Sequence, residues 1–280
     1  MSSDTSNVES KVGKLVAGRY KLLQQIGSGG MGVVYAAQHH LTKRLVAVKM
    51  LHVESSGRSE HVARFMQEAE LISKIVHPNI VEVFDMGQDP DDSTFFIAQT
   101  LLEGRSLRKH LRTLPEGMAP AAAVDLIIPL LGALVAVHKC GIIHRDIKPE
   151  NIFLADSDHG EVVPKLLDFG ISKATGESDV ARFRTGTGVV LGTPDYLSRE
   201  QALCDPTIDS RTDIWSIGIV LYEMLSGPAP YKGNTAVAVI ANIMSKSPPR
   251  IETLAPRTPP GLAKIVHRAV APDRADRYPS

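Results

Sequence analysis

The sequence predicts an α+β protein with two lobes, a small antiparallel β lobe with one helix followed by a larger helical lobe. Up to about residue 99, apolar residues fall in short runs that are rich in Val, Leu and Tyr and broken by glycines, which is typical of strands. Beyond Gly104 they recur at helical spacing in longer stretches. A chain of 280 residues is long enough for two small domains or one large one.

Charge and composition exclude several classes of protein. Lys plus Arg and Asp plus Glu both number 31, so no net positive charge favours nucleic acid or anionic lipid, and we expect no nucleic-acid partner. Two cysteines are too few for a disulfide framework or a four-ligand zinc site. The longest apolar run, residues 126–137, is shorter than the roughly 20 residues of a membrane-spanning helix and predicts a buried core helix. We therefore expect no membrane segment within this chain and a cytoplasmic location, with a membrane anchor beyond residue 280 left open.

The first hundred residues contain mainly strand signals. Residues 1–19 are polar without an apolar period, which predicts a flexible N-terminal tail and a domain over 20–280. Strands of one antiparallel sheet are predicted where the chain reads YKLLQQI, GVVYAAQH and RLVAVKML, followed by short strands at residues 80–84 and 95–98. Between them, apolar residues near 3.6-residue spacing over 59–76 predict one helix.

The rest of the chain is predicted to be mainly helical. Helical stretches are expected at residues 107–114, 121–139, 213–225, 235–244 and 261–270. From Ile142 to Glu200, short apolar strands alternate with polar loops, and the candidate chemistry concentrates there. We divide the domain into a small lobe at 20–99, a hinge at 100–104 and a large lobe at 105–280.

A glycine-rich segment is the first candidate binding motif. Residues 27–32 read GSGGMG and fit G-x-G-x-x-G, in which absent side chains let backbone N–H groups approach phosphate oxygens. Ordinary turn glycines are the alternative. A dinucleotide-binding fold would open a helix after this loop, whereas here a strand pattern continues, which argues against a nicotinamide cofactor. Lys49 ends the next strand, VAVK, and Glu68 on the following helix either pairs with it or is a solvated surface charge.

The strongest motifs lie in the second half. Residues 144–151 read HRDIKPEN, and 168–170 read DFG after an apolar strand. In this order, with the glycine-rich loop, Lys49 and Glu68, they resemble the signature set of protein kinases. The segments HPNIVEVFDMG and GTPDYLSREQ look most like bacterial eukaryotic-like (Hanks-type) Ser/Thr protein kinases. The resemblance extends from Tyr20 onward and implies a protein-kinase-like bilobal fold, of which this chain would lack the final helix.

The resemblance implies an enzyme that uses ATP with Mg²⁺, with Mn²⁺ as the alternative metal. Asp168 would bind the metal ion that bridges the phosphates, and Asn151 would bind a second one through its amide oxygen. Lys49, paired to Glu68, would hold the α- and β-phosphates.

The same resemblance implies a protein substrate with a Ser or Thr hydroxyl. Asp146 would orient that hydroxyl and accept its proton. Lys148 would steady the transferring phosphoryl group. Val34, Ala47 and Phe153 would enclose adenine. The expected nucleotide-binding residues together are Ile26, Gly27, Ser28, Gly29, Gly30, Met31, Gly32, Val33, Val34, Ala47, Lys49, Thr100, Leu102, Glu103 and Phe153.

Regulatory and structural residues are also implied by the resemblance. Arg145 would pair with a phosphorylated residue of the activation segment, with Thr185 and Thr187 as candidates. Glu200 matches the Glu of an A-P-E motif that reads SRE here, and Arg277 matches its usual ion-pair partner.

The function that follows is ATP-dependent transfer of the γ-phosphoryl group to protein hydroxyls, with autophosphorylation of the activation segment. One alternative is a pseudokinase scaffold that binds nucleotide and partners without catalysis. The other is a small-molecule phosphotransferase of related fold, which would not be expected to carry HRDIKPEN together with a GTP-x-Y segment.

Overall fold

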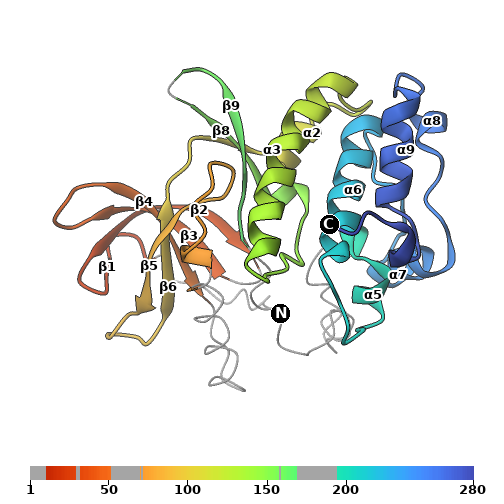
Figure 1. The fold of residues 1–280 in the computed structure, drawn as a ribbon. Helices are drawn as coiled ribbons and strands as arrows, with labels where there is room; N and C mark the ends of the chain where they lie inside the picture. Colours follow the sequence, from red (N-terminus) through yellow and green to blue (C-terminus); the bar gives the residue numbers. More distant parts are fainter. Residues whose placement is uncertain (1–10, 30–31, 52–69, 71, 158, 169–193) are drawn as a thin grey trace, which may run out of the picture. The chain divides into compact units, whose positions relative to one another are not determined.

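A computed structural model describes residues 11–29, 32–51, 70, 72–157, 159–168 and 194–280. The chain divides into two compact units, the first formed by Met1–Ala69 and Glu82–Leu102 and the second by Glu70–Val81 and Glu103–Ser280. The first unit carries an antiparallel sheet and the second most of the helices (Figure 1). This arrangement confirms the predicted sequence of a β part followed by a helical part.

The first unit is built on a six-stranded sheet with the strand order β1-β2-β3-β4-β6-β5. Its strands are β1 (Leu15–Val16), β2 (Tyr20–Gly29), β3 (Gly32–His39), β4 (Leu45–Leu51), β5 (Val83–Gln88) and β6 (Phe95–Thr100). Alternating residues of β3 and β4, among them Val33, Tyr35, Val46 and Val48, are buried in one core on one face of the sheet. The three strands predicted between residues 20 and 51 are therefore confirmed.

The start of the domain differs from the prediction. Residues 1–19 were predicted to be a flexible tail, but β1 pairs with β2 and Val16 is fully buried. Two lysines tie this segment to the loop between β5 and β6: Lys14 Nζ lies 2.5 Å from Asp89 Oδ2, and Lys11 Nζ lies 2.7 Å from Asp92 Oδ2. The prediction is wrong for residues 11–19, because a two-residue strand is too short to show an alternating pattern.

The segment before β5 also differs in part. Residues 70, 72 and 73 are helical, as predicted for the end of the 59–76 helix, whose earlier part lies outside the described residues. Ile80 was predicted to start a strand, but it forms only an isolated bridge with Leu166, and β5 begins at Val83. Because of such contacts Glu70–Val81 groups with the second unit rather than with the predicted small lobe, and the division falls between Leu102 and Glu103, inside the predicted hinge.

The second unit combines helices with a three-stranded sheet in the order β7-β8-β9. Its strands are β7 (Gly104–Ser106), β8 (Ile152–Asp156) and β9 (Val162–Leu166). Its α-helices are α2 (Leu107–Leu111), α3 (Pro120–Lys139), α5 (Arg199–Ala202), α6 (Arg211–Ser226), α7 (Ala236–Ser245), α8 (Ile251–Leu254) and α9 (Pro260–Ala269). Short 3-10 helices are η1 (Pro149–Asn151), η3 (Pro194–Tyr196) and η4 (Arg274–Asp276). All five helices predicted beyond Gly104 are present.

Helix α6 forms the centre of this unit. Every residue from Thr212 to Ser226 is buried, as expected of a helix with neighbours on all sides. At Gly218 a Cβ atom would lie 2.8 Å from the Cβ of Ala269, so the absence of a side chain lets α9 pack closely against α6.

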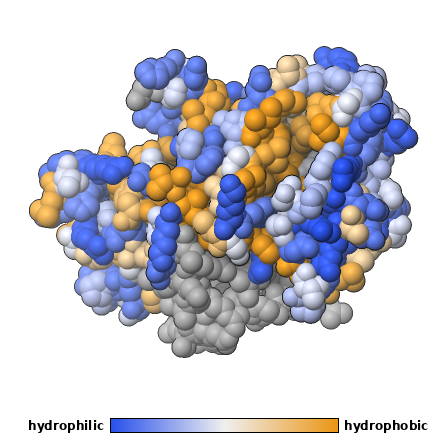
Figure 2. All heavy atoms as spheres, viewed as in Figure 1, coloured by the Kyte–Doolittle hydropathy of each residue, from blue (hydrophilic) through white to orange (hydrophobic). Residues whose placement is uncertain are grey.

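Helix α3 is long and apolar enough to cross a bilayer by length and composition alone. However, one of its faces, which includes Ile127, Leu130 and Leu134, is buried in the core of the second unit, as predicted for a core helix. Its opposite face exposes Ile128 and Val135, and Figure 2 shows apolar side chains gathered over this helix.

Candidate active site

The loop that carries the HRD motif has no regular secondary structure between α3 and η1, so its backbone needs other hydrogen-bond partners. Asp213, fully buried in the first turn of α6, supplies them. Its Oδ2 accepts the N–H of His144 at 2.8 Å, and its Oδ1 accepts the N–H of Arg145 at 2.9 Å. His138 Nε2 from α3 lies 2.8 Å from the same Oδ2. Two helices therefore hold the loop.

Arg145 adopts a backbone conformation that is uncommon for a residue with a side chain, with φ at 60°. Its N–H is bound by Asp213, and its carbonyl accepts Gln201 Nε2 at 2.9 Å. Hydrogen bonds on both sides of the residue thus compensate the cost of this conformation.

Three predicted catalytic residues meet at one carboxylate. Asp146 Oδ2 accepts hydrogen bonds from Lys148 Nζ and from Asn151 Nδ2, both at 2.8 Å. Asn151 Nδ2 also donates to the carbonyl of Asp146 at 2.9 Å. The Asp146 side chain is 8% exposed and is held in one orientation. Since its amide nitrogen serves Asp146, Asn151 has its amide oxygen to offer to a ligand.

Asp168 is the fourth predicted catalytic residue of this unit. The residue before it, Leu167, forms hydrogen bonds to both ends of the segment HRDIKPEN. The N–H of Leu167 donates to the carbonyl of Asn151 at 2.8 Å. The carbonyl of Leu167 lies 3.1 Å from His144 Nε2. The backbone next to Asp168 is thus bonded to the backbone of Asn151. The amide oxygen of Asn151 and the carboxylate of Asp168 are hard oxygen donors, which are the ligands that Mg²⁺ prefers.

His144 supports this arrangement as a neutral ring. Burial lowers the pKa of His144, so the imidazole is uncharged at neutral pH. In the tautomer that donates from Nε2 to Leu167, its Nδ1 accepts the N–H of Asp146, 3.3 Å away. The ring therefore connects the two segments that carry Asp146 and Asp168.

Three predicted nucleotide-binding residues of the first unit, Val34, Ala47 and Lys49, share one face of the sheet, whereas Val33, also predicted to bind nucleotide, faces the core. Val34 pairs with Gly27 on β2 and with Lys49 on β4, and Ala47 lies on the same face of β4 as Lys49. This face is opposite the core, where the side chain of Val33 is buried.

Gly32 begins β3 with φ at 153°, and a Cβ atom there would lie 2.0 Å from the Met50 carbonyl oxygen. The close approach of β3 and β4 at this point thus requires glycine.

The other predicted binding residues are distributed over both units. Ile26, Ser28, Gly29, Thr100 and Leu102 belong to the first unit, and Glu103 and Phe153 belong to the second. Glu68, Gly30, Met31, Thr185 and Thr187 lie outside the described residues. The pairing of Lys49 with Glu68 and the role of the two threonines stay predictions.

The ion pair expected between Glu200 and Arg277 is present and fully enclosed. Arg277 Nη1 lies 2.6 Å from Glu200 Oε1, and Nη2 lies 3.0 Å from Oε2. Arg277 also donates to the carbonyl of Ala271 at 2.8 Å, and its guanidinium stacks 4.8 Å from the ring centre of Trp215. The proline missing from the A-P-E position is replaced by a capping box, in which Ser198 and Gln201 bond each other's backbone at the start of α5.

A polar network around Arg108 was not predicted from the sequence. Arg108 on α2 binds Glu150 Oε1 at 2.7 Å and Glu223 Oε1 at 2.6 Å, and it also contacts the hydroxyl of Tyr196. Burial raises the pKa of the neighbouring Asp195, and the charge of Glu223 raises it further. The partners of Arg108 all lie 42 or more residues away from it in the chain, so no local pattern predicts the network. The position of Glu150 within HRDIKPEN was the only indication in the sequence.

Comparisons with known proteins agree with this geometry. The family model described as "Protein kinase domain" matches residues 20–278. The chain is 38% identical over 262 residues to the serine/threonine-protein kinase pkn2 of Myxococcus xanthus, covering 93% of this chain and 31% of that protein. It is 35% identical over 268 residues to the serine/threonine-protein kinase PrkC of Bacillus subtilis, covering 95% of this chain and 39% of that protein.

A solved structure resembles the whole chain. A crystal structure of a variant of the Mycobacterium tuberculosis PknI kinase domain superimposes with a TM-score of 0.73 at 25% identity, covering 98% of this chain and 95% of that one. The chain spans between 31% and 39% of the two curated relatives named above, whose remaining parts it does not match. With the family model matched over nearly its full length, the chain belongs to the protein kinase family.

Proposed function

We propose that this domain transfers the γ-phosphoryl group of ATP to Ser or Thr hydroxyls of protein substrates in the cytoplasm, with Mg²⁺ as the metal. The observation that carries the proposal is the Asp146 carboxylate, which Lys148 and Asn151 hold in one orientation. The names of the relatives, all serine/threonine-protein kinases, support the same reaction. The proposed domain begins at residue 11, not at residue 20, because β1 belongs to the sheet.

Asp146 orients the substrate hydroxyl and accepts its proton as the oxygen attacks the γ-phosphorus. Lys148, at 2.8 Å from Asp146 Oδ2, places a positive charge beside the transferring group. Asn151 and Asp168 offer oxygen ligands for Mg²⁺, which when bound neutralises charge on the phosphates. Lys49, on the face of the sheet opposite its core, binds phosphate oxygens of the nucleotide.

The test is transfer of label from γ-labelled ATP to the chain or to a generic protein substrate in the presence of Mg²⁺. We expect phosphoserine or phosphothreonine, and a loss of about 1,000-fold or more in kcat for Asp146→Asn, because this variant removes the proton acceptor and keeps the shape. Lys49→Met should lose activity to a similar extent. Glu116→Gln, at an exposed carboxylate, is the matched control and should retain full activity.

The pseudokinase scaffold is the competing function. Intact Lys49, Asp146, Asn151 and Asp168 argue against it. A wild-type protein that binds ATP but transfers no phosphate with Mg²⁺ or Mn²⁺ to any substrate would establish the scaffold in place of the enzyme.

We also propose that Arg145 receives a phosphate from the activation segment, at Thr185 or Thr187. Support comes from its guanidinium, whose Nε is buried without a hydrogen-bond partner among the described residues. A phosphate brings about −1.5 to −2 charge and three acceptor oxygens, which suits such a group. Mass spectrometry after incubation with ATP should find phosphate on one or both threonines, and the double variant Thr185→Ala with Thr187→Ala should lower kcat about tenfold or more. An unchanged kcat in this double variant would refute the regulatory role.

A further inference from the structure

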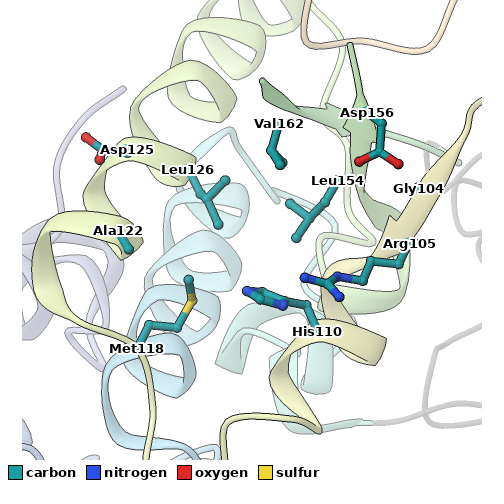
Figure 3. A pocket seen from close by; sticks show the side chains of 10 residues that line it. All are labelled: Gly104, Arg105, His110, Met118, Ala122, Asp125, Leu126, Leu154, Asp156 and Val162. Carbon is teal, nitrogen blue, oxygen red and sulfur yellow. The ribbon is translucent and has the colours of Figure 1, made fainter. Parts of the chain in front are cut away.

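A pocket lies in the second unit, lined by none of the residues of the candidate active site. It has a volume of about 690 Å³, within the range of roughly 300 to 1,000 Å³ that is usual for small-molecule sites. It opens between β7, α2, α3 and the hairpin of β8 and β9 (Figure 3). The lining residues are Gly104, Arg105, His110, Met118, Ala122, Asp125, Leu126, Leu154, Asp156 and Val162.

One side of the pocket is apolar and is held in place by backbone contacts. The side chains of Met118, Leu126 and Leu154 converge on the same space (Figure 3). The N–H of Met118 donates to the carbonyl of Met224 on α6 at 2.6 Å. At Gly104, with φ at 126°, a Cβ atom would lie 2.1 Å from the Leu154 carbonyl oxygen, so β7 and β8 are in close contact there. These contacts fix the positions of Met118 and Leu154 in the pocket wall.

The other side presents two nitrogen-bearing groups. Arg105 and His110 both point into the pocket (Figure 3). Arg105 makes no ion pair in the described part of the chain, and His110 Nδ1 is buried there without a hydrogen-bond partner. A buried ring nitrogen without a partner destabilises the fold unless a ligand or water binds it. Burial lowers the pKa of His110, and the charge of Arg105 lowers it further, so the ring is neutral at pH 7.

Two carboxylates also line the pocket. Asp125 points away from the other lining side chains, and Asp156 lies at the exposed end of β8. Neither pairs with Arg105. Among the described residues, no carboxylate therefore neutralises the positive charge of Arg105 in this pocket.

We propose that this pocket binds an amphipathic carboxylate of the fatty-acid type, with its head group between Arg105 and His110 and its alkyl chain against Met118, Leu126 and Leu154. A guanidinium binds a carboxylate through two parallel hydrogen bonds, and a neutral imidazole donates one more. The apolar wall removes the alkyl chain from water. The site is separate from the catalytic loop, so the proposal does not depend on kinase activity.

Calorimetric titration of the whole chain with decanoate, below the concentration at which it forms micelles, tests the proposal. We expect saturable binding of one decanoate per chain, at least tenfold tighter than that of decanol, which has the same chain length without the charge. Arg105→Gln should weaken decanoate binding at least tenfold and leave decanol binding unchanged. Arg112→Gln, at an exposed arginine that ends α2, the helix that carries His110, is the matched control and should bind decanoate like the wild type.

Two further measurements test the apolar part of the site and the part that binds the head group separately. Ala122→Phe fills the pocket and should abolish binding of both molecules, with an unchanged melting temperature as the check of folding. The bound carboxylate should raise the pKa of His110, seen as a shifted titration of its ring resonances in NMR spectra. Arg105 opposes this rise, whereas Asp125 and Asp156 favour it. Absence of saturable binding up to about 1 mM, equal affinity for decanol, equal behaviour of Arg105→Gln and Arg112→Gln, or an unmoved His110 would each overturn the proposal.

Discussion

The two units position their candidate site residues in different ways. In the first unit the sheet does it: Val34 and Lys49 are cross-strand neighbours, so the hydrogen-bond register of β3 and β4 decides where they lie. In the second unit the HRD loop has no register, and distant side chains such as Asp213 and Gln201 hold its backbone. We therefore expect a substitution on the sheet to remove one function, whereas a substitution at a loop anchor should displace several catalytic groups together.

Among the substitutions that test this difference between the units, we expect the largest losses of stability and of kcat at Asp213. Asp213→Asn replaces one carboxylate oxygen with an NH₂ group. This group cannot accept the hydrogen bonds that the oxygen accepted from a backbone N–H or from His138. We expect the free energy of unfolding to fall by about 3 to 5 kcal/mol, because a buried charge with three donors is lost. We expect kcat to fall about 100-fold or more. Urea unfolding and the labelled-ATP assay measure the two effects.

Two controls belong to this experiment. Asp209→Asn, just before the same helix, changes a partly exposed carboxylate and should alter stability by less than about 0.5 kcal/mol. Lys49→Met should lose activity while keeping its unfolding free energy within about 1 kcal/mol of the wild type. If Asp213→Asn were fully active, the loop would have to be held by other contacts, and the contrast between the units would fail.

The next effect concerns the anchor formed by Glu200 and Arg277. Glu200→Gln leaves the guanidinium of Arg277 buried without its counter-charge, so we expect a loss of about 3 to 5 kcal/mol in urea unfolding. The exposed pair of Arg250 and Glu252 is the comparison, and Glu252→Gln should cost less than about 1 kcal/mol. Equal losses in the two variants would show that burial does not distinguish these pairs.

The smallest expected effect on stability is at Asp195, one of three carboxylates around Arg108, the others being Glu150 and Glu223. The folded pKa of Asp195 lies above its unfolded value, so ionising this group destabilises the fold as pH rises. Asp195→Asn should therefore melt about 1 to 3 °C higher than the wild type at pH 7. The difference should vanish below about pH 3, where the carboxyl is protonated in both the folded and the unfolded state. Thermal melts across this pH range check it, and a lower melting temperature for the variant at pH 7 would contradict the assignment.

Local sequence patterns were enough to predict most of the helices and strands and the short-range part of the site. Short runs rich in Val, Leu and Tyr predicted β2, β3 and β4, and 3.6-residue spacing predicted α3, α6 and α9, because such local patterns reflect which residues an element buries. The grouping of Asp146, Lys148 and Asn151 was also visible, since these residues lie within six positions of one another and need only one local turn to meet.

Contacts between positions far apart in the chain could be found only in the folded structure. The strand β1 is two residues long and depends on ion pairs to a loop more than 70 residues later, so no local pattern announced it. The partners of Arg108, the hold of Asp213 on the HRD loop and the pocket beside His110 each join segments that are far apart in the chain. Such contacts depend on how packed elements bring polar groups together and remove them from water, which periodicity in one segment does not encode.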